Sequence, residues 1–369
     1  MDWQGKKLRD MLRDKGVTLV EIAEKLQVSR QAVNDWVNGT IPKGRHLLAL
    51  SQFLGISPEG FFSPVTQDIV VPVHRKRRNA KLTESRQEQA IEMVKSYDGF
   101  YRNRSRVKLQ RVIRFPADHE EKDLSDLPNK LRRLADARNY YPLQFQQIFR
   151  LFENLEIEVV FRRFPADLKS YAFFTEIYGY PVVFVNTSNN LLDLAFPMLH
   201  EAIHALCKKE QGGSAEFSEV EELLCDRLAS QVLFTPEYIR EVGESLKGLP
   251  TAQQVIKLKR FSKTHFHSMF GIVQCLNQNG FGVKVSVGGA DTNIHKDFTT
   301  LEEVLFGEGS AARFVENLAS FSPIFVKELK KRLPTISDPL LAEWLGLVSS
   351  LDAKEIRENL ESISINNGK

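Results

Sequence analysis

Two histidines, His200 and His204, stand four residues apart in an apolar stretch of this 369-residue chain, and Glu201 directly follows the first. Apolar side chains at helical spacing predict that residues 191–210 form a helix. Histidines four apart on a helix lie on one side, one turn above the other, so both can bind one metal ion. Glu201 could then act on a water molecule without binding the metal. This is the H-E-x-x-H arrangement, in which the glutamate is a general base.

A second helix is predicted for residues 218–233, after a glycine-rich break. A catalytic zinc ion needs a third protein ligand besides two histidines. Glu222 and Asp226 lie four residues apart, so they share one face of this helix. We expect Glu222 to complete the site and Asp226 to orient a ligand imidazole from the second helix. Glu219 and Glu221 are competitors for the third ligand, because composition alone does not separate them. The alternative is that the H-E-x-x-H pattern occurs by chance on a surface helix and that the second helix only carries a solvated acidic patch. The short distance in sequence between the two helices argues against this alternative.

The first 62 residues predict a compact unit of five helices. Thr18 and Glu21 have the spacing of a capping box, and Ser29 is a typical helix cap. Two short helices joined by a tight turn, the second rich in Arg, Gln and Asn, predict a helix-turn-helix motif. Gln27 stands in the turn, where many such motifs have glycine. The predicted helices cover residues 5–15, 19–26, 30–37 and 45–54, with a short fifth helix from residue 57.

The second helix of such a motif lies in the major groove of DNA, where its side chains reach base edges. A small helical bundle that binds protein is the alternative interpretation, but the spacing of the apolar residues favours DNA binding. The expected contacts are Arg30, Gln31 and Asn34 at base edges, and Ser29, Lys43 and Arg45 at phosphates.

Residues 5–62 resemble a Cro/C1-type (XRE-type) helix-turn-helix domain, and residues from about 125 to 240 resemble the ImmA/IrrE family of zinc metallopeptidases. The second resemblance rests on four segments. These are a helical pair feeding a strand at 131–159, a strand at 181–186, the motif at 200–204, and the pattern Glu222-x-x-Cys225-Asp226-x-x-Ala229-x-x-x-Leu233-x-x-Pro236.

The resemblance implies that Glu222, rather than Glu221, is the third zinc ligand. It also implies that Asp226, four residues later, contacts a zinc histidine. The chain departs from the family pattern at residues 193–197, where the family often has an arginine and a Phe-Thr pair, and at Ile203, where glycine is common. These departures bear on substrate specificity more than on zinc binding.

Members of the family cleave or control a repressor, often in stress responses. The resemblance therefore implies a DNA-binding regulator with a zinc-dependent endopeptidase domain that cleaves a repressor or itself. The alternative is a non-enzymatic transcription factor or antitoxin whose peptidase-like domain only senses zinc or a ligand. Expected partners are operator DNA, a repressor substrate and a second copy of the chain. Candidate donors for the oxyanion are Tyr178, Tyr180, His265 and His267.

The composition, with 42% hydrophobic and 26% charged residues, is that of an ordinary globular protein. There is no apolar run of eighteen residues and no signal peptide, which argues against a membrane protein. Cys207, Cys225 and Cys275 do not form a disulfide framework, so we expect a reducing, cytoplasmic location.

We expect an α+β, mostly helical protein with four segments. They are a helix-turn-helix domain (1–64), a basic linker (65–124), a metallopeptidase-like domain with a small sheet (125–240), and a helical domain for sensing or dimerisation (241–369). The segment from Pro72 to Arg114 contains thirteen Lys and Arg residues but only four Asp and Glu residues. This segment could follow DNA phosphates. Equally, it could be a solvated helix at 84–96 followed by an edge strand at 107–115.

Further elements are expected from apolar patterns and turn residues. Ser262 is a possible cap within the helical stretch 253–279. We expect the tail after Ile363 to be disordered. The predicted strands are 156–161, 171–174, 181–186 and 281–287, and two C-terminal helices are expected at 314–333 and 339–349.

Overall fold

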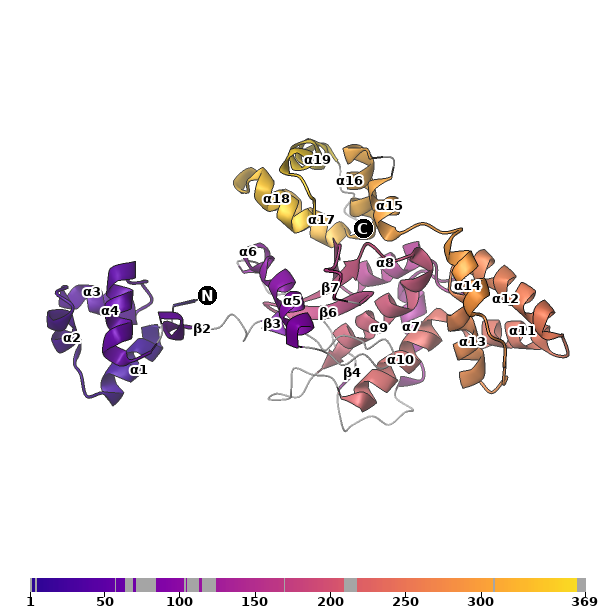
Figure 1. Ribbon diagram of the computed structural model, residues 1–369, viewed down its shortest axis with the longest axis horizontal. Coiled ribbons are helices and arrows are strands. Elements are labelled where there is room, and N and C mark those ends of the chain that lie inside the picture. Colours follow the sequence, from indigo (N-terminus) through magenta and orange to yellow (C-terminus); the bar gives the residue numbers. More distant parts are fainter. Residues whose placement is uncertain are drawn as a thin grey trace. The chain divides into compact units, whose positions relative to one another are not determined.

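The computed structural model describes residues 2–3, 5–56, 58–63, 69–70, 84–102, 104, 113–114, 124–168, 170–208, 218–307 and 309–363. Contacts divide the chain into two compact units, Met1–Val70 and Val71–Lys369 (Figure 1). The protein is mostly helical with a small sheet, which confirms the predicted α+β class. The finer division into four segments stays a prediction.

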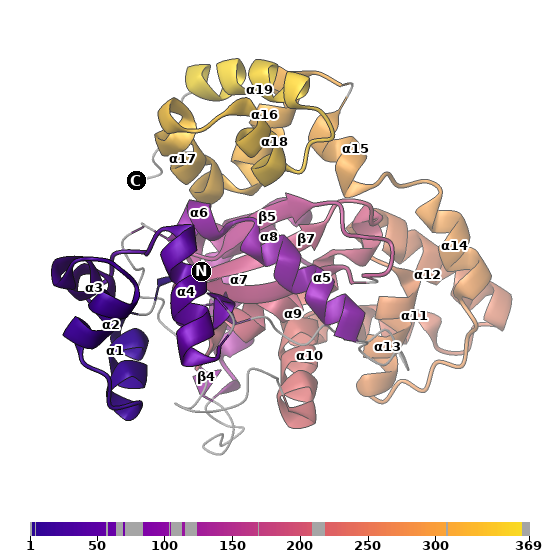
Figure 2. The ribbon, with the colours of Figure 1, turned by 60° about the vertical axis from the view of Figure 1, so that its left-hand side comes forward.

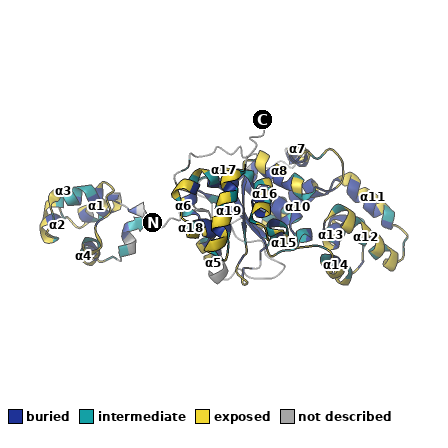
Figure 3. Cartoon of the chain, turned by 90° about the horizontal axis from the view of Figure 1, so that it is seen from above, coloured by how far each residue is buried: buried dark blue, intermediate teal, exposed yellow. Residues whose placement is uncertain are grey.

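The first unit is a bundle of short helices closed by a two-stranded ribbon. Trp3 on β1 donates from Nε1 to the carbonyl of Trp36 at 2.6 Å. The buried apolar residues of this unit form one core cluster, and buried and exposed residues share its helices (Figure 3). The predicted fifth helix is a 3-10 turn. The elements are β1 (Asp2–Trp3), α1 (Gly5–Asp14), α2 (Leu19–Lys25), α3 (Arg30–Val37), α4 (Gly44–Leu54), the 3-10 turn Pro58–Phe61, β2 (Phe62–Ser63), which pairs antiparallel with β1, and β3 (Ile69–Val70).

Local sequence signals set where α2 and α3 begin. Thr18 and Glu21 form the predicted capping box at the start of α2. The Ser29 hydroxyl accepts from the Ala32 N–H at 3.1 Å and caps α3. Gln27, in the turn between the helices, has a φ of 53°, a left-handed conformation that favours glycine. The turn is therefore present although Gln27, which has a side chain, adopts a sterically strained backbone conformation there.

A small, buried mixed sheet forms the centre of the second unit. Strand β7 (Tyr180–Asn186) pairs in parallel with β5 (Glu158–Arg162) and antiparallel with β6 (Ala172–Ile177). All seven residues of β7 are buried, as expected for a strand covered on both faces. The three strands confirm the strands predicted in this region. Strand β5 starts two residues later than predicted, beyond Glu156, whose φ is 56°.

Helices pack on this sheet, and one of them carries the H-E-x-x-H motif of residues 200–204. Helix α9 (Ala195–Leu206) packs against β6 and β7, and α10 (Glu219–Leu233) packs against α9 (Figure 1). The prediction of one helix over 191–210 was wrong at both ends. A 3-10 turn (Leu191–Asp193) precedes α9, and α9 ends where β8 (Cys207–Lys208) pairs in parallel with β4 (Ile113–Arg114). Two further helices, α7 (Leu127–Leu134) and α8 (Phe145–Asn154), pack on α10 and α9.

Two helices of the predicted linker pack in this unit, against a helix close to the C-terminus. The Tyr97 hydroxyl donates to the carbonyl of Trp344 at 2.5 Å, and the Trp344 indole donates to the carbonyl of Ser96 at 3.1 Å. Phe100 is fully buried beside Trp344. The helices are α5 (Glu84–Lys95) and α6 (Asp98–Tyr101); most of the basic stretch before and after them lies outside the described residues.

The C-terminal part is helical, as predicted, in two groups that Figure 2 separates clearly. Helices α16 and α17 contact α8 and β5. The groups are α11 (Pro236–Leu246), α12 (Thr251–His265), α13 (Met269–Gln278) and α14 (Gly288–His295), then α15 (Leu301–Phe306), α16 (Ala311–Phe321), α17 (Pro323–Arg332), the 3-10 turn Leu333–Thr335, α18 (Asp338–Leu345) and α19 (Ser350–Ser362).

Several C-terminal predictions were wrong in detail. Residues 281–287 form no strand. Ser262 lies inside α12, where its hydroxyl donates to the carbonyl of His267, and Ser268 is the residue that caps α13. The predicted helix at 314–333 is divided at Ser322, because Pro323 starts a new helix. Helix α19 was not predicted, and residues 364–369 lie outside the described part. No helix within the described ranges is long and apolar enough to cross a membrane.

Candidate metal centre and DNA-binding helix

Two facing helices bring three metal-binding side chains together. On α9, the Nε2 atoms of His200 and His204 lie 2.8 Å apart. From α10, one Glu222 oxygen lies 3.3 Å from His200 Nε2, and the other lies 3.3 Å from His204 Nε2. One ligand atom of each residue lies within 4.8 Å of the others. Among the described residues, this is the group of His, Cys, Asp and Glu side chains that could hold a metal ion.

The two competing glutamates on α10 are placed differently. Glu221 is buried and forms a capping box with Ser218, accepting from the Ser218 N–H while its own N–H donates to the Ser218 hydroxyl. Glu219 is exposed. Geometry therefore agrees with Glu222 as the third ligand, although the ligand role itself stays a prediction.

Each histidine is supported at its other ring nitrogen. Asp226 Oδ1 lies 2.9 Å from His200 Nδ1. Cys225 Sγ lies 3.4 Å from His204 Nδ1. Asp226 thus stands where it was expected, behind one ligand imidazole. The sequence does not predict this contact of Cys225, because one cysteine in a helix carries no local signal of contact with a distant histidine.

Glu201 lies on α9 beside the first of these histidines. Its side chain is buried, and Oε2 accepts a hydrogen bond from the Phe174 N–H of β6 at 2.7 Å. Burial raises the pKa of Glu201, although the two histidines and the Phe174 hydrogen bond act against this. A carboxylate with a raised pKa is a better proton acceptor.

The three candidate ligands carry complementary charges. Burial would raise the pKa of Glu222, but hydrogen bonds from His200 and His204 hold it well below its usual range. Burial would lower the pKa of His204, but Cys225 and Glu222 raise it to about 9. Glu222 is therefore an anion next to imidazole rings, a pairing that also suits a bound cation.

The four candidate oxyanion donors make their observed contacts elsewhere. The Tyr178 hydroxyl donates to Asp98, and Tyr180 packs against the Arg104 guanidinium. His265 stacks on Tyr141, and His267 lies 3.3 Å from the Tyr238 hydroxyl. These contacts give the four residues structural roles in the resting fold.

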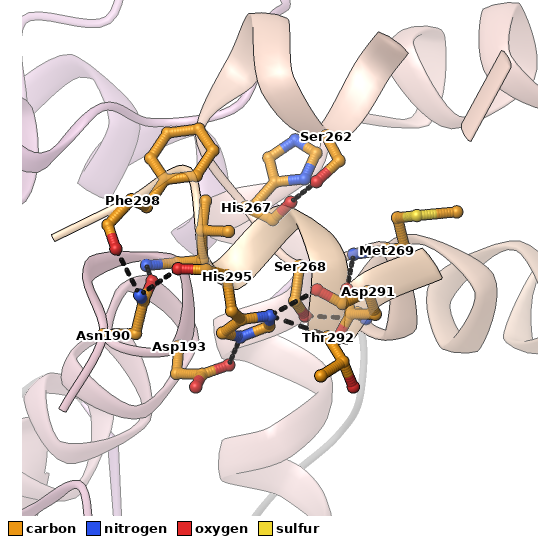
Figure 4. A network of polar contacts seen from close by, with 12 residues as sticks. Asn190, Asp193, Ser262, His267, Ser268, Met269, Asp291, Thr292, His295 and Phe298 are labelled. Atoms are coloured by element: carbon orange, nitrogen blue, oxygen red, sulfur yellow. Dashed lines mark hydrogen bonds and ion pairs between the residues drawn. The ribbon is translucent and has the colours of Figure 1, made fainter. Parts of the chain in front are cut away.

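The segment leading into α9 is held by the C-terminal helices (Figure 4). The Asn190 side chain donates to the carbonyls of His295 and Phe298 at 2.9 and 2.8 Å. His295 Nε2 lies 3.0 Å from Asp193 Oδ1, and Asp291 accepts from the Met269 N–H at 2.7 Å. The sequence contains no signal for the contacts of Asn190 and Asp193, since their partners lie about a hundred residues further along the chain.

In the first unit, α3 presents the predicted DNA-contacting side chains. Arg30 and Gln31 are exposed and Asn34 is half-buried. The Gln31 amide donates to Asp35 at 2.7 Å. Ser29, Lys43 and Arg45 are exposed at the starts of α3 and α4, where helix N-termini can meet phosphates.

Two models of known protein families match this chain, one over the first unit and one over the region of the candidate metal centre. Residues 7–61 match a family model described as helix-turn-helix. Residues 152–248 match a peptidase-family model described as IrrE N-terminal-like domain. No curated protein and no solved structure matches the chain. The chain therefore joins a helix-turn-helix domain to an IrrE N-terminal-like, peptidase-like domain, as the two resemblances predicted. The helix-turn-helix match supports DNA binding.

Proposed function

We propose that the protein is a DNA-binding transcriptional regulator whose IrrE-like domain is a zinc-dependent endopeptidase. Its cleavage of a repressor, or of its own chain, would switch gene expression. The observation that carries this proposal is the convergence of His200, His204 and Glu222 beside the buried carboxyl group of Glu201. The helix-turn-helix unit would bring the peptidase to the operator where the repressor acts.

The donor set fits zinc. Catalytic zinc sites use three protein ligands, typically imidazole nitrogens and carboxylate oxygens, and keep one position open. His200, His204 and Glu222 would hold the ion, and Asp226 would orient His200. When bound, zinc lowers the pKa of water and polarises the scissile carbonyl group.

Glu201 would move the proton. Its carboxylate takes a proton from the attacking water and passes it to the leaving amine. The hydrogen bond from Phe174 fixes one carboxylate oxygen, so the side chain keeps one orientation in the buried site. Burial raises the Glu201 pKa, which suits a group that must accept a proton and then release it.

The alternative is a regulator whose peptidase-like domain only senses zinc or a ligand. One observation favours it. The Glu201 carboxylate bonds the backbone of β6, and this contact would tie α9 to the sheet in a protein that hydrolyses nothing. The two functions differ in whether Glu201 must accept a proton.

Glu201→Gln separates them. The amide keeps the size of the side chain and can accept from the Phe174 N–H, but it cannot take up the proton. We expect the variant to fold and bind zinc like the wild type, and to lose cleavage of a co-encoded repressor or of its own chain. Immunoblots and an operator-driven reporter in cells under the inducing condition measure both effects. Glu219→Gln, an exposed change on α10, is the matched control. If cells with the Glu201→Gln variant still relieve repression normally, hydrolysis is not the mechanism and the domain acts as a sensor.

A further inference from the structure

A stretch of the second unit, residues 245–290, contains basic residues but no Asp or Glu, although the whole chain carries 50 basic and 47 acidic residues. It covers α12, α13 and the segment 281–287. Lys263 pairs with Asp297 at 2.5 Å, and Lys247 pairs with a glutamate just before the stretch. The remaining basic residues carry its excess positive charge: Lys257, Lys259, Arg260 and Lys284.

The turn between α12 and α13 has the same geometry as the turn of the helix-turn-helix unit. Phe266 has a φ of 57° and Gln27 a φ of 53°, so both residues are left-handed. Two residues after each of them, a serine caps the next helix. The Ser268 hydroxyl accepts from the Gly271 N–H at 3.1 Å, as the Ser29 hydroxyl does at the start of α3.

Residues at equal distances from the two turns are also buried in both motifs. The His267 N–H donates to the carbonyl of Ser262 at 3.4 Å, and the Ser262 hydroxyl donates to the carbonyl of His267 at 2.6 Å (Figure 4). The Val28 N–H donates in the same way to the carbonyl of Ala23 at 2.9 Å. Helix α13 therefore corresponds to α3. The matching buried pairs are Ser262 with Ala23, Ile272 with Val33, Cys275 with Trp36, and Leu276 with Val37.

The segment after α13 is fixed on this second motif. Helices α11, α12 and α13 pack on one another. Asn277 on α13 binds both backbone groups of Val283, accepting from the N–H at 2.6 Å and donating to the carbonyl at 3.0 Å. A Cβ atom at Gly243 on α11 would lie 2.2 Å from the Phe281 ring, so the glycine lets this ring pack there. Lys284, which is exposed, is thus held close to α13.

The first carboxylate after the stretch does not offset its charge at the surface. Asp291 Oδ1 accepts from the Met269 N–H at 2.7 Å, and Oδ2 lies 3.7 Å from His295 Nδ1. The Asp291 side chain is only 16% exposed. Its charge is therefore turned towards the N-terminus of α13 and the imidazole ring, and the outer surface of the motif stays positive.

We propose that α12, α13 and residues 281–287 form a second DNA-binding surface, which contacts the phosphates of double-stranded DNA without reading its sequence. The second helix of such a motif lies in the major groove, and basic side chains at phosphates give affinity for any sequence. The positions that are expected to read bases on α3 are occupied on α13 by Met269, Phe270 and Val273. These side chains cannot hydrogen-bond base edges. The inference goes beyond the proposed function and does not depend on zinc.

Hydrogen exchange of the full-length protein, with and without a DNA duplex of unrelated sequence, is the first test. At low salt, where phosphate contacts bind most strongly, we expect slower exchange in α13 and residues 281–287 as well as in α1–α4. Peptides from α18 and α19 are the internal control and should not change. Slower exchange confined to the first unit, or no change anywhere, would overturn the proposal.

The salt dependence of binding to the same duplex, measured by fluorescence anisotropy, is the second test. Arg260→Gln combined with Lys284→Gln removes two exposed cations. The slope of log affinity against log salt concentration should become about two units shallower, one for each lost phosphate contact. Lys327→Gln combined with Lys354→Gln removes the same charge from exposed positions on α17 and α19, and is the matched control. Equal slopes for the two double variants would contradict the second surface.

The two DNA-binding sites can fail separately. Gln31→Ala with Asn34→Ala tests operator recognition by α3, and the Arg260 and Lys284 changes test the second surface. If only the first pair of changes affects DNA binding, the first unit is the DNA-binding part and the inference is wrong. If only the second pair does, α3 is not the reading helix and the second surface stands.

Discussion

Asp226 contacts the candidate ligand His200, with its Oδ1 atom 2.9 Å from the Nδ1 atom of the ring. A carboxylate at this place fixes the orientation of the His200 ring and makes its Nε2 atom a stronger electron-pair donor to a metal ion. The side chain of Asp226 is one third exposed, so its removal opens no large cavity. Its contribution should therefore appear in metal binding rather than in folding.

Removal of Asp226 and of His204 should lower zinc content to different degrees. Purified wild-type protein is expected to contain about one zinc ion per chain. His204→Ala removes a ligand and should empty the site. Asp226→Ala should weaken zinc binding by about 10–100-fold, the usual cost of losing such a partner. Elemental analysis and chelator titration measure both. Equal zinc in wild type and His204→Ala would show that the ligand assignment is wrong.

At the scale of elements, α3 is the helix on which sequence-specific DNA binding should depend. Gln31→Ala and Asn34→Ala should each weaken binding to the operator by about 1–3 kcal/mol, while nonspecific affinity stays nearly unchanged. Gln31 donates to Asp35, so base contact requires it to exchange that bond. Gln52→Ala, an exposed glutamine on α4, is the control. A footprint of the double variant that equals the wild-type footprint would exclude α3 as the reading helix.

Helix α14 is tied to the start of α9 by a histidine between two carboxylates. His295 lies against Asp193 and Asp291. Burial lowers the His295 pKa, but the Asp291 carbonyl and Asp193 outweigh it, and the pKa is raised above 6.5. A raised pKa in the folded state means that the protonated ring stabilises the fold. This contribution is complete below pH 6.5 and disappears as the pH rises through the folded-state pKa.

The stability of this contact should therefore fall as the pH rises above 6.5. Hydrogen exchange of the α14 amides, corrected for the intrinsic effect of pH, is expected to show progressively weaker protection in the wild type. His295→Gln keeps a polar side chain but cannot be protonated, so its protection should be independent of pH in this range. A pH dependence that is the same in both proteins would mean that another group controls the contact.

At the scale of the whole molecule, Arg104 makes two ion pairs that join three distant segments of the second unit. Arg104, in the predicted linker, lies 2.7 Å from Glu158 on β5 and 3.5 Å from Glu328 on α17. The Tyr101 hydroxyl donates to Glu158 at 3.1 Å. Burial raises the Glu158 pKa, and Arg104 opposes this. The described part of the linker is thus built into the same unit as the sheet and the C-terminal helices.

Loss of Arg104 should destabilise this whole unit. Arg104→Ala leaves the Glu158 carboxylate buried without its partner, which typically costs about 3–5 kcal/mol. Arg102→Ala removes a more exposed arginine that pairs with Asp98 one turn away, and should cost about 1 kcal/mol or less. Urea unfolding followed by a probe of the second unit measures both. Similar small effects for the two variants would contradict a structural role for the Arg104 pair.

Patterns within about four residues were sufficient to predict much of the protein. Helix caps such as Thr18 and Ser29, the alternation of buried residues, and the spacing of His200 and His204 act over one or two helical turns. Backbone hydrogen bonds and side-chain directions over that distance depend on near neighbours alone. The two domain types, the helix-turn-helix and the H-E-x-x-H helix, follow from such patterns.

Tertiary structure decided how these elements meet. Glu221 and Glu222 are adjacent and chemically identical, and only the packing of α10 on α9 places Glu222 at the histidines and leaves Glu221 at the helix cap. The same packing puts Cys225 behind His204. Contacts between residues far apart in the chain depend on which faces bury together across the whole unit. That outcome is a property of the complete set of packed surfaces, and no single stretch of sequence contains it.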